Sequence, residues 1–369
     1  MQASTETDRS PPFASGPIAP ALLGWYDRHA RVLPWRVPPG SGAVADPYRV
    51  WLSEVMLQQT TVAAVREYFA KFTARWPTVH DLAAADEAEV MAAWAGLGYY
   101  SRARNLIAAG RAVAAMGAFP DSEAALRALP GLGAYTAAAV AAIAFGRRAV
   151  VVDANVERVV ARLFLIEQPL PGARPAIRDA AGAITPDARP GDFAQAMMDL
   201  GATVCTPRAP RCMICPLIAS CRAQAAGKAA DLPAKPTRKA KPARQGRVWW
   251  IERDGRVWLV TRPARGMLGG MRALPDDGWS ARGDGHATPP FAARWRHGGA
   301  VAHSFTHFDL DLQLMLCEPG EIGHDLPAPV GEGTWWPIAG IEAAGLPTVF
   351  AKAARLALAA RDDTTTRER

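Results

Sequence analysis

Four of the five cysteines lie in one stretch of seventeen residues, CTPRAPRCMICPLIASC. They are Cys205, Cys212, Cys215 and Cys221, spaced C-x6-C-x2-C-x5-C. Four thiolates at short spacing can bind a tetrahedral zinc ion or a 4Fe-4S cluster. Zinc ribbons usually combine two separated CxxC knuckles, whereas this stretch has one CxxC with wider flanks. The spacing therefore favours a 4Fe-4S cluster, with structural zinc as the alternative.

A glutamate in the stretch DPYRVWLSEVMLQQT, residues 46–60, has the surroundings of a general acid. Asp46 followed by Pro47 predicts a helix start, and on that helix most neighbours of Glu54 one turn away are apolar. Burial against apolar groups disfavours the ionised carboxyl and raises its pKa, as a general acid working near neutral pH requires. The alternative is that Glu54 lies at the edge of this face, exposed and inert.

An aspartate stands where an apolar run meets an amphipathic helix, in AVVVDANVERVVARLFLI, residues 149–166. The simplest interpretation makes Asp153 the N-cap of that helix. A carboxylate beside the positive end of a helix is also kept ionised. The two interpretations are compatible.

A pair of glycines precedes a further helical pattern in LPGLGAYTAAAVAAIAFG, residues 129–146. Gly131 and Gly133 permit a tight turn, and backbone N–H groups at a turn and helix start can bind a phosphate without reading sequence. By itself, this pattern is equally typical of a plain turn between two helices.

Composition is consistent with a globular protein that binds a polyanion. Half of the 369 residues are hydrophobic, the net charge is +7 and the pI is about 9.4, which favours nucleic acid over an anionic membrane as partner. Residues 1–20 have no apolar core of a secretory signal, and no apolar run is long enough to span a membrane. We therefore expect an intracellular protein, in which clustered cysteines bind metal rather than form disulfides.

The pattern changes along the chain from helical to alternating. We expect residues 1–19 to be disordered, 20–222 to form an all-α module, 223–246 to be a Lys- and Pro-rich linker, and 247–369 to form an α+β domain. The α+β assignment rests on a hairpin around Asp254-Gly255, an alternating strand at 307–318 and a closing helix at 347–360.

Taken together, these segments resemble the adenine DNA glycosylases, the MutY family. The resemblance covers nearly all of residues 21–222. It rests on PWR (34–36), WLSEVMLQQT (51–60), GLGYYSRARNL (96–106), LPGLGAYTA (129–137), VDANVERV (152–159), QAMMDLGA (195–202) and the cysteine loop 205–221. It implies a helix-hairpin-helix at 127–146 and a 4Fe-4S cluster on the four cysteines.

The resemblance also implies roles for individual residues. Glu54 matches the glutamate that protonates adenine at N7, and Asp153 matches the aspartate that stabilises the oxocarbenium-like sugar. Tyr135 and Asn155 match positions that assist in the same pocket. Gln59 and Tyr99 match residues that wedge into the duplex around the opposite base. The family's Asp-Gly-Asn is here Asp153-Ala154-Asn155, which is compatible unless that backbone needs a positive φ.

The distribution of lysine predicts a glycosylase that does not cut the strand. A strand-cutting glycosylase needs an amine that forms a Schiff base. In the related endonuclease III proteins that lysine follows the hairpin, at the position of Tyr135 here. Lys71 is the only lysine in residues 1–227, and its segment reads as an outer helical face.

The second domain resembles the MutT-like, Nudix-fold domain of MutY, which recognises 8-oxoguanine. Phe305, Thr306 and His307 occupy the place of the family's Phe-Ser-His loop, and threonine keeps the hydroxyl. Alternatively, these are ordinary turn residues. Residues 265–290 contain no glutamates at Nudix spacing, so we expect no pyrophosphate hydrolysis.

The sequence thus predicts a monomeric, cytoplasmic, nucleoid-associated base excision repair enzyme. Its expected substrate is double-stranded DNA with adenine opposite 8-oxoguanine or guanine. Two alternatives remain open: a bifunctional endonuclease III-like glycosylase and lyase, and a non-enzymatic iron–sulfur DNA-binding sensor in which Glu54 and Asp153 are structural.

Overall fold

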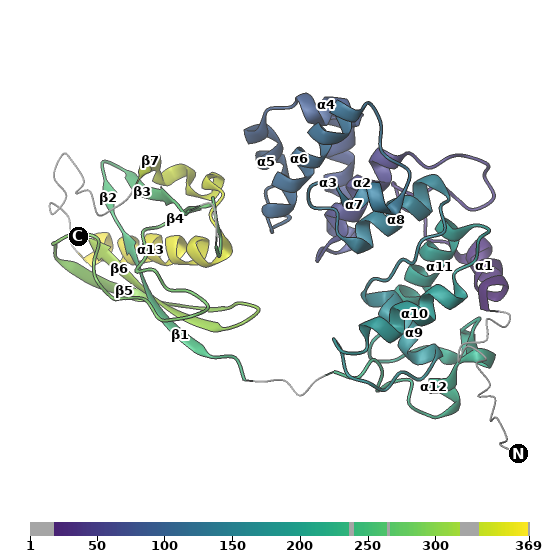
Figure 1. Cartoon of the computed structure of the whole chain (residues 1–369). Helices are drawn as coiled ribbons and strands as arrows, with labels where there is room; N and C mark the ends of the chain where they lie inside the picture. Colours follow the sequence, from purple (N-terminus) through teal and green to yellow (C-terminus); the bar gives the residue numbers. More distant parts are fainter. Residues whose placement is uncertain (1–17, 236–239, 264–265, 318–331, 368–369) are drawn as a thin grey trace, which may run out of the picture. The chain divides into compact units, whose positions relative to one another are not determined.

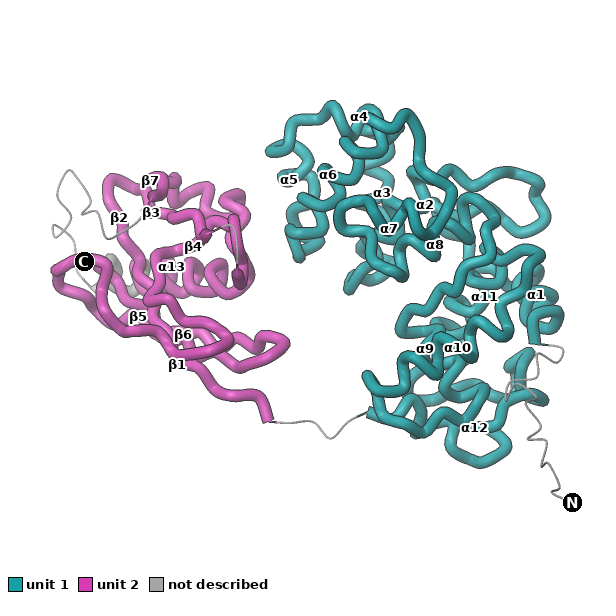
Figure 2. Tube along the Cα trace, viewed as in Figure 1, with its two compact units in different colours: residues 1–238 teal, residues 239–369 magenta. Residues whose placement is uncertain are grey.

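The chain folds into two compact units, residues 1–238 and 239–369 (Figure 1, Figure 2). The computed structural model describes residues 18–235, 240–263, 266–317 and 332–367. The first unit is helical and the second combines two sheets with helices, which confirms the predicted order of an all-α module followed by an α+β domain.

Twelve α-helices make up the described part of the first unit. They are α1 (Ile18–His29), α2 (Pro47–Leu57), α3 (Val62–Arg75), α4 (Val79–Ala84), α5 (Glu87–Trp94), α6 (Ser101–Met116), α7 (Glu123–Arg127), α8 (Ala134–Phe145), α9 (Ala154–Leu163), α10 (Arg174–Ile184), α11 (Pro190–Thr203) and α12 (Arg222–Ala225). Short 3-10 turns at Cys212–Ile214 and Ile218–Ser220 lie in the cysteine loop. Among the described helices, none is both long and apolar enough to cross a bilayer.

Two hydrophobic cores organise this unit. Helices α2 to α8 enclose the first core, around Trp51, Phe69 and Trp94, whereas α1 and α9 to α11 enclose the second, around Tyr26 and Val160. Figure 1 shows the two groups of helices as separate lobes. A cavity can form where the lobes meet, because side chains there belong fully to neither core.

Helix α8 joins the lobes through small side chains. Its sequence AYTAAAVAAIAF is buried along most of its length, and it packs against α2, α7 and α11. Because alanine is small, three helices can approach its backbone closely. This packing brings the first turn of α8, with Tyr135, beside Glu54 on α2.

Seven strands lie in the described part of the second unit. They are β1 (Ala243–Trp250), β2 (Glu252–Arg253), β3 (Arg256–Thr261), β4 (Arg272–Ala273), β5 (Trp295–Ser304), β6 (Asp309–Cys317) and β7 (Gly333–Pro337), followed by a 3-10 helix (Ile338–Ala344) and α13 (Thr348–Arg367). In one sheet, β6 pairs with β1 in parallel and with β5 antiparallel. In the other, β3 pairs antiparallel with β2, β4 and β7. Helix α13 packs against β1, β5 and β6 (Figure 1).

The predicted hairpin and strand of this unit are present with adjusted limits. Asp254 and Gly255 both have left-handed backbone angles, φ 49° and 68°, as a two-residue hairpin turn requires. The strand predicted at 307–318 begins at Asp309, because the amide of Phe305 donates to the carbonyl of Phe308 at 2.9 Å and closes a turn before it. Thr306 and His307 therefore lie at an exposed loop tip.

The limits of the first unit also differ from the sequence-based expectation. The disorder predicted for residues 1–19 falls on residues outside the described part of the chain, except that α1 already begins at Ile18. Ile18 shares a helical face with Leu22 and is buried in the second core, so apolar packing extends the helix. The residues 223–235 of the predicted linker pack on this unit, where Leu232 is buried and its carbonyl accepts from Arg162 Nε at 2.9 Å.

The close packing of α11 on α9 leads to a prediction about the free energy of unfolding. A Cβ at Gly201 would lie 2.6 Å from Asn155 Cβ and 3.0 Å from its carbonyl oxygen, so Gly201→Ala should destabilise the fold by about 1–3 kcal/mol through overpacking. Gly24→Ala in α1 is the matched control, since nothing lies within 4 Å of the added methyl. It should stabilise by up to about 1 kcal/mol through helix propensity. Urea unfolding followed by helical circular dichroism measures both, and a shift in the same direction for the two variants would contradict the packing argument.

Candidate active site

Glu54 is a buried carboxyl near the end of α2. The helix starts as predicted: Asp46 caps it by accepting from the amide of Tyr48 at 2.9 Å, with Pro47 in the first turn. Only 6% of Glu54 is exposed. Its Oε2 accepts a hydrogen bond of 2.6 Å from the hydroxyl of Tyr135 on α8.

The surroundings of Glu54 favour its protonated form. Burial raises the pKa of Glu54 above its ordinary value of 4.5, and the charge of Asp153 raises it further. The hydrogen bond from Tyr135 and the positive charge of Arg36 lower it, but burial is the largest effect. Burial also raises the pKa of Tyr135 well above its ordinary value, so its hydroxyl stays a donor. Glu54 therefore keeps its proton to higher pH than an exposed glutamate does.

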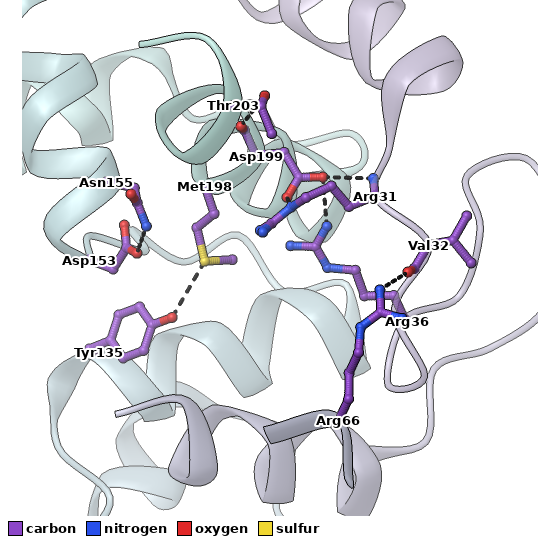
Figure 3. Close-up of polar contacts among 10 residues, drawn as sticks. All are labelled: Arg31, Val32, Arg36, Arg66, Tyr135, Asp153, Asn155, Met198, Asp199 and Thr203. Carbon is purple, nitrogen blue, oxygen red and sulfur yellow. Dashed lines mark hydrogen bonds and ion pairs between the residues drawn. The ribbon is translucent and has the colours of Figure 1, made fainter. Parts of the chain in front are cut away.

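Asp153 has the opposite surroundings at the N-terminus of α9. It is the N-cap of the helix, and its Oδ1 accepts from the amide of Val156 at 2.7 Å. Its Oδ2 accepts from Asn155 Nδ2 at 2.7 Å (Figure 3). Two donors and the positive end of a helix stabilise negative charge on this carboxyl. Ala154 is the first helical residue and is not among the left-handed residues, so alanine fits where the family has glycine.

One cavity contains both carboxyls. Its volume is about 1020 Å³, and Glu54, Tyr135, Asp153 and Asn155 all line it. The side chains of Tyr135, Asp153 and Asn155 lie around the same space in Figure 3. A proton donor and a negative charge can therefore act on one bound molecule.

The glycine turn lies at the edge of this cavity, and its two glycines differ. Gly131 has φ 72°, and a Cβ there would lie 2.5 Å from Asn105 Cβ, so both conformation and space require glycine. Gly133 is the N-cap residue of α8 with φ −75°, and nothing lies within 4 Å of an added Cβ. The open side at Gly133 leaves the start of α8 accessible to an anion.

Gln59 and Tyr99 are exposed residues with strained backbones. Their φ angles are 57° and 49°, in the left-handed region that is uncommon for residues other than glycine. Both loops are held by Arg102, whose guanidinium donates to the carbonyls of Val55 and Met56 on α2 and to that of Leu97. Such strain persists only where the surrounding structure imposes it, and it is common at functional sites.

The four cysteines meet around a second, smaller cavity. Cys205, Cys212, Cys215 and Cys221 all line it. Within the described ranges, no three acidic, histidine or cysteine side chains are placed to hold a single metal ion; the four thiols instead line a space. Arg162, which is buried, donates through Nη1 to Cys205 Sγ at 3.2 Å and to the carbonyl of Thr206 at 2.8 Å.

A second buried arginine joins the cysteine loop to Asp153. Arg158 donates through Nε to the carbonyl of Cys205 at 2.7 Å and through Nη2 to Asn155 Oδ1 at 2.9 Å. Asn155 in turn donates to Asp153. The position of the carboxylate thus depends on the cysteine loop.

In the second unit, Thr306 and His307 project from a braced loop. The rings of Phe305 and Phe308 stack with centroids 4.7 Å apart, and both pack on Trp279. In addition, Lys241 Nζ donates to the Ser304 hydroxyl at 2.9 Å and to the Phe305 carbonyl at 2.5 Å. The exposed tip is therefore held on a rigid base.

Sequence reasoning missed several residues of the main cavity. Arg31, Arg36 and Met198 line it, and Asp199 lies directly behind its wall. Arg36 and Asp199 stand inside motifs that carried the resemblance, without a role assigned to either. The available signal was an aspartate in a helix whose inward positions are mostly apolar.

Comparison with known proteins places each unit in a family. The family described as "HhH-GPD superfamily base excision DNA repair protein" matches residues 52–179, and the NUDIX domain family matches residues 247–356. An adenine DNA glycosylase of Mycolicibacterium smegmatis is 43% identical over 208 residues, covering 56% of this chain and 69% of the relative. The chain belongs to the adenine DNA glycosylase family.

Other relatives agree with membership of the adenine DNA glycosylase family but are longer. The enzymes of Rattus norvegicus and Homo sapiens are 45% and 47% identical, and the matched regions cover 44% and 39% of their lengths. A solved structure of a thermostable thymine-DNA glycosylase is 29% identical with a TM-score of 0.50, and covers 56% of this chain and 95% of that one. The helical unit thus has the helix-hairpin-helix glycosylase fold.

Burial of Glu54 predicts a stability gain when its charge is removed. Between the unfolded pKa, near 4.5, and the raised folded pKa, the folded state binds more protons, so stability falls as pH rises through this window. Glu54→Gln cannot ionise and should become more stable than wild type as pH rises through the window, then keep a constant advantage. Thermal midpoints measured from pH 4 to 8 test this, with Glu67→Gln on the exposed face of α3 as control. An advantage that does not change with pH would contradict it.

Proposed function

We propose that this protein is a monofunctional adenine DNA glycosylase of base excision repair. Its substrate is double-stranded DNA with adenine opposite 8-oxoguanine or guanine, and it acts as a cytoplasmic, nucleoid-associated monomer. The observation that carries the proposal is the shared cavity, which is lined both by Glu54, whose pKa burial raises, and by Asp153, which caps a helix end.

The chemistry follows from the two environments. An adenine inside a duplex is inaccessible, so the nucleotide must first turn out of the helix into the cavity. Glu54 protonates the base at N7, and the bond between C1′ and N9 breaks with its electron pair going to the base. Asp153 stabilises the oxocarbenium-like sugar, and water adds at C1′ with loss of a proton. The products are free adenine and an abasic site.

The remaining cavity residues support this step. Tyr135 donates to Glu54 and orients it, and Asn155 donates to Asp153. Gln59 and Tyr99 are exposed and wedge into the duplex around the opposite base. The start of α8 at Gly133, beside the turn at Gly131, binds a backbone phosphate.

Cys205, Cys212, Cys215 and Cys221 fit a 4Fe-4S cluster. All four thiols line one cavity, and four cysteine ligands are the donor set of such clusters. When bound, the cluster supplies a fixed scaffold for the loop. Arg208, Arg211 and Arg222 are exposed on and beside this loop and extend its basic surface toward phosphate.

Base hydrolysis without strand cleavage is consistent with the cavity lining. None of the described residues that line the cavity is a lysine, and Tyr135 occupies the place of the lyase amine. Lys71 lies on the exposed face of α3, its ammonium 5.6 Å from the centroid of the Tyr68 ring.

The second unit supplies the recognition of 8-oxoguanine. Excised adenine is a normal base, so specificity must come from the opposite base. The Thr306 hydroxyl and the His307 ring are exposed at the tip of the braced loop and are available to hydrogen-bond the altered base edge.

Excision assays test the reaction directly. Duplexes with A:8-oxoguanine, A:G and A:T are incubated with enzyme and then heated in alkali, which cuts abasic sites. Wild type should cut the first two, whereas Glu54→Gln and Asp153→Asn should each lose roughly 10²- to 10⁴-fold in rate. Glu67→Gln controls for loss of a surface carboxyl. Intact A:8-oxoguanine duplex after wild-type treatment would refute the proposed function, and strand breaks before alkali or efficient borohydride trapping would favour the bifunctional alternative.

If the loop recognises 8-oxoguanine, a loop variant should lose excision rate on A:8-oxoguanine but not on A:G. Thr306→Val should lower the single-turnover rate on A:8-oxoguanine by roughly tenfold, about the contribution of one hydrogen bond, and leave the A:G rate unchanged. Thr334→Val, the same change at an exposed position of β7, is the matched control. An equal loss on both substrates would assign Thr306 a structural role instead.

A further inference from the structure

A fully buried carboxylate lies behind the wall of the active-site cavity. Asp199 on α11 has no exposed surface, and three donors from one segment converge on it. Arg31 donates through its backbone amide at 3.0 Å and through Nε at 2.6 Å, and Arg36 donates through Nη1 at 2.7 Å (Figure 3). A buried ion cluster of this kind depends on every partner, because an unpaired buried charge is costly.

The two arginines belong to the cavity itself. Arg31 and Arg36 line it together with Leu33 and Trp35, so the segment 31–36 forms one of its walls. This segment is not helical or extended over its length, and Asp199 is the anchor that ties it to α11. The carboxylate thus acts on the cavity through the arginines rather than by contact with a substrate.

The charge of Arg36 reaches Glu54. Among the described groups, those that act on Glu54 are Tyr135 from α8, Arg36 from this wall and Asp153 at the start of α9, and Arg36 favours loss of the proton. The groups that face Asp199 are Arg31, Arg36 and Tyr26 of α1; burial raises the pKa of Tyr26 to about 12, so its hydroxyl is neutral. Asp199 therefore supplies the negative charge that offsets the two guanidinium groups.

We propose that Asp199 is a positioning residue for base excision: its carboxylate fixes the cavity wall through Arg31 and Arg36, and it balances the positive charge of that wall beside Glu54. The inference rests on the proposed function, since it concerns the protonation of the general acid. It assigns a role that no motif or contact with the base reveals.

The proposal predicts different effects of Asp199 on the rate of base excision and on the affinity for duplex DNA. Without the Asp199 charge, the wall gains one net positive charge, which does not weaken attraction to DNA. Excision, in contrast, slows at neutral pH because less Glu54 is protonated. A loss in rate without a loss in duplex affinity is therefore expected.

Single-turnover rates on A:8-oxoguanine duplex, measured across pH with saturating enzyme, test the proposal. For Asp199→Asn we expect the excision rate at neutral pH to be lower by roughly tenfold or more. The high-pH limb of its pH–rate profile should move to lower pH, and duplex binding should be retained. Asp199→Glu keeps the charge and should keep the limb near its wild-type position. Asp199→Asn combined with Arg36→Gln removes one charge of each sign, and its limb should return toward wild type.

Two results would overturn the proposal. One is an Asp199→Asn profile that overlays wild type; the other is a double variant whose limb does not return. If Asp199→Asn does not fold, as judged by circular dichroism, Arg36→Gln alone decides: a high-pH limb moved to higher pH supports the proposal and an unmoved limb refutes it. Failure of the proposed function is distinguishable, because wild type would then release no adenine at any pH.

Discussion

The burial of one carboxyl among side chains of two helical lobes is the constraint on which the active site depends. In its proposed role as general acid, Glu54 needs surroundings that raise its pKa, yet it must face a cavity large enough for a nucleoside. The structure meets both needs by placing Glu54 where α2 packs against the alanine-rich α8, with the Tyr135 hydroxyl as a close donor. Asp153 shares the cavity but lies at a helix end and accepts from a backbone amide and from Asn155, so the two carboxyls have different surroundings although they are chemically alike.

Buried arginines hold the irregular segments that surround this site. Arg102 binds carbonyls at the end of α2, Arg158 binds those of Cys205 and Gly201, and Arg162 binds those of Thr206 and Leu232. These carbonyls lie in loops and at helix ends, where few have regular backbone partners. A planar guanidinium can donate to several such acceptors at once, which a lysine ammonium does less specifically. This use of arginine gives a physical reason for the near absence of lysine from residues 1–227.

The second unit follows the same principle on a β scaffold. The loop tip with Thr306 and His307 is braced by stacked phenylalanines and by Lys241, so its polar groups are held ready before any ligand arrives. A preorganised loop loses little conformational freedom on binding, which suits the recognition role proposed for Thr306 and His307.

The amino-acid sequence by itself determined the features that depend on neighbours along the chain. Asp46 and Asp153 cap their helices, Gly131 adopts the left-handed turn, and Asp254-Gly255 makes a hairpin, because each is governed by bonds within a few residues. The order of the helical and α+β units followed from the change in hydrophobic period. Only the tertiary structure decided that Glu54 and Asp153 face one cavity, that α1 begins at Ile18 and that residues 223–235 pack on the first unit. It alone brought Asp199 to Arg31 and Arg36, which are separated from it by 168 and 163 residues. Such contacts depend on how helices pack, and packing is set by the shapes of whole surfaces, which no local spacing of residues encodes.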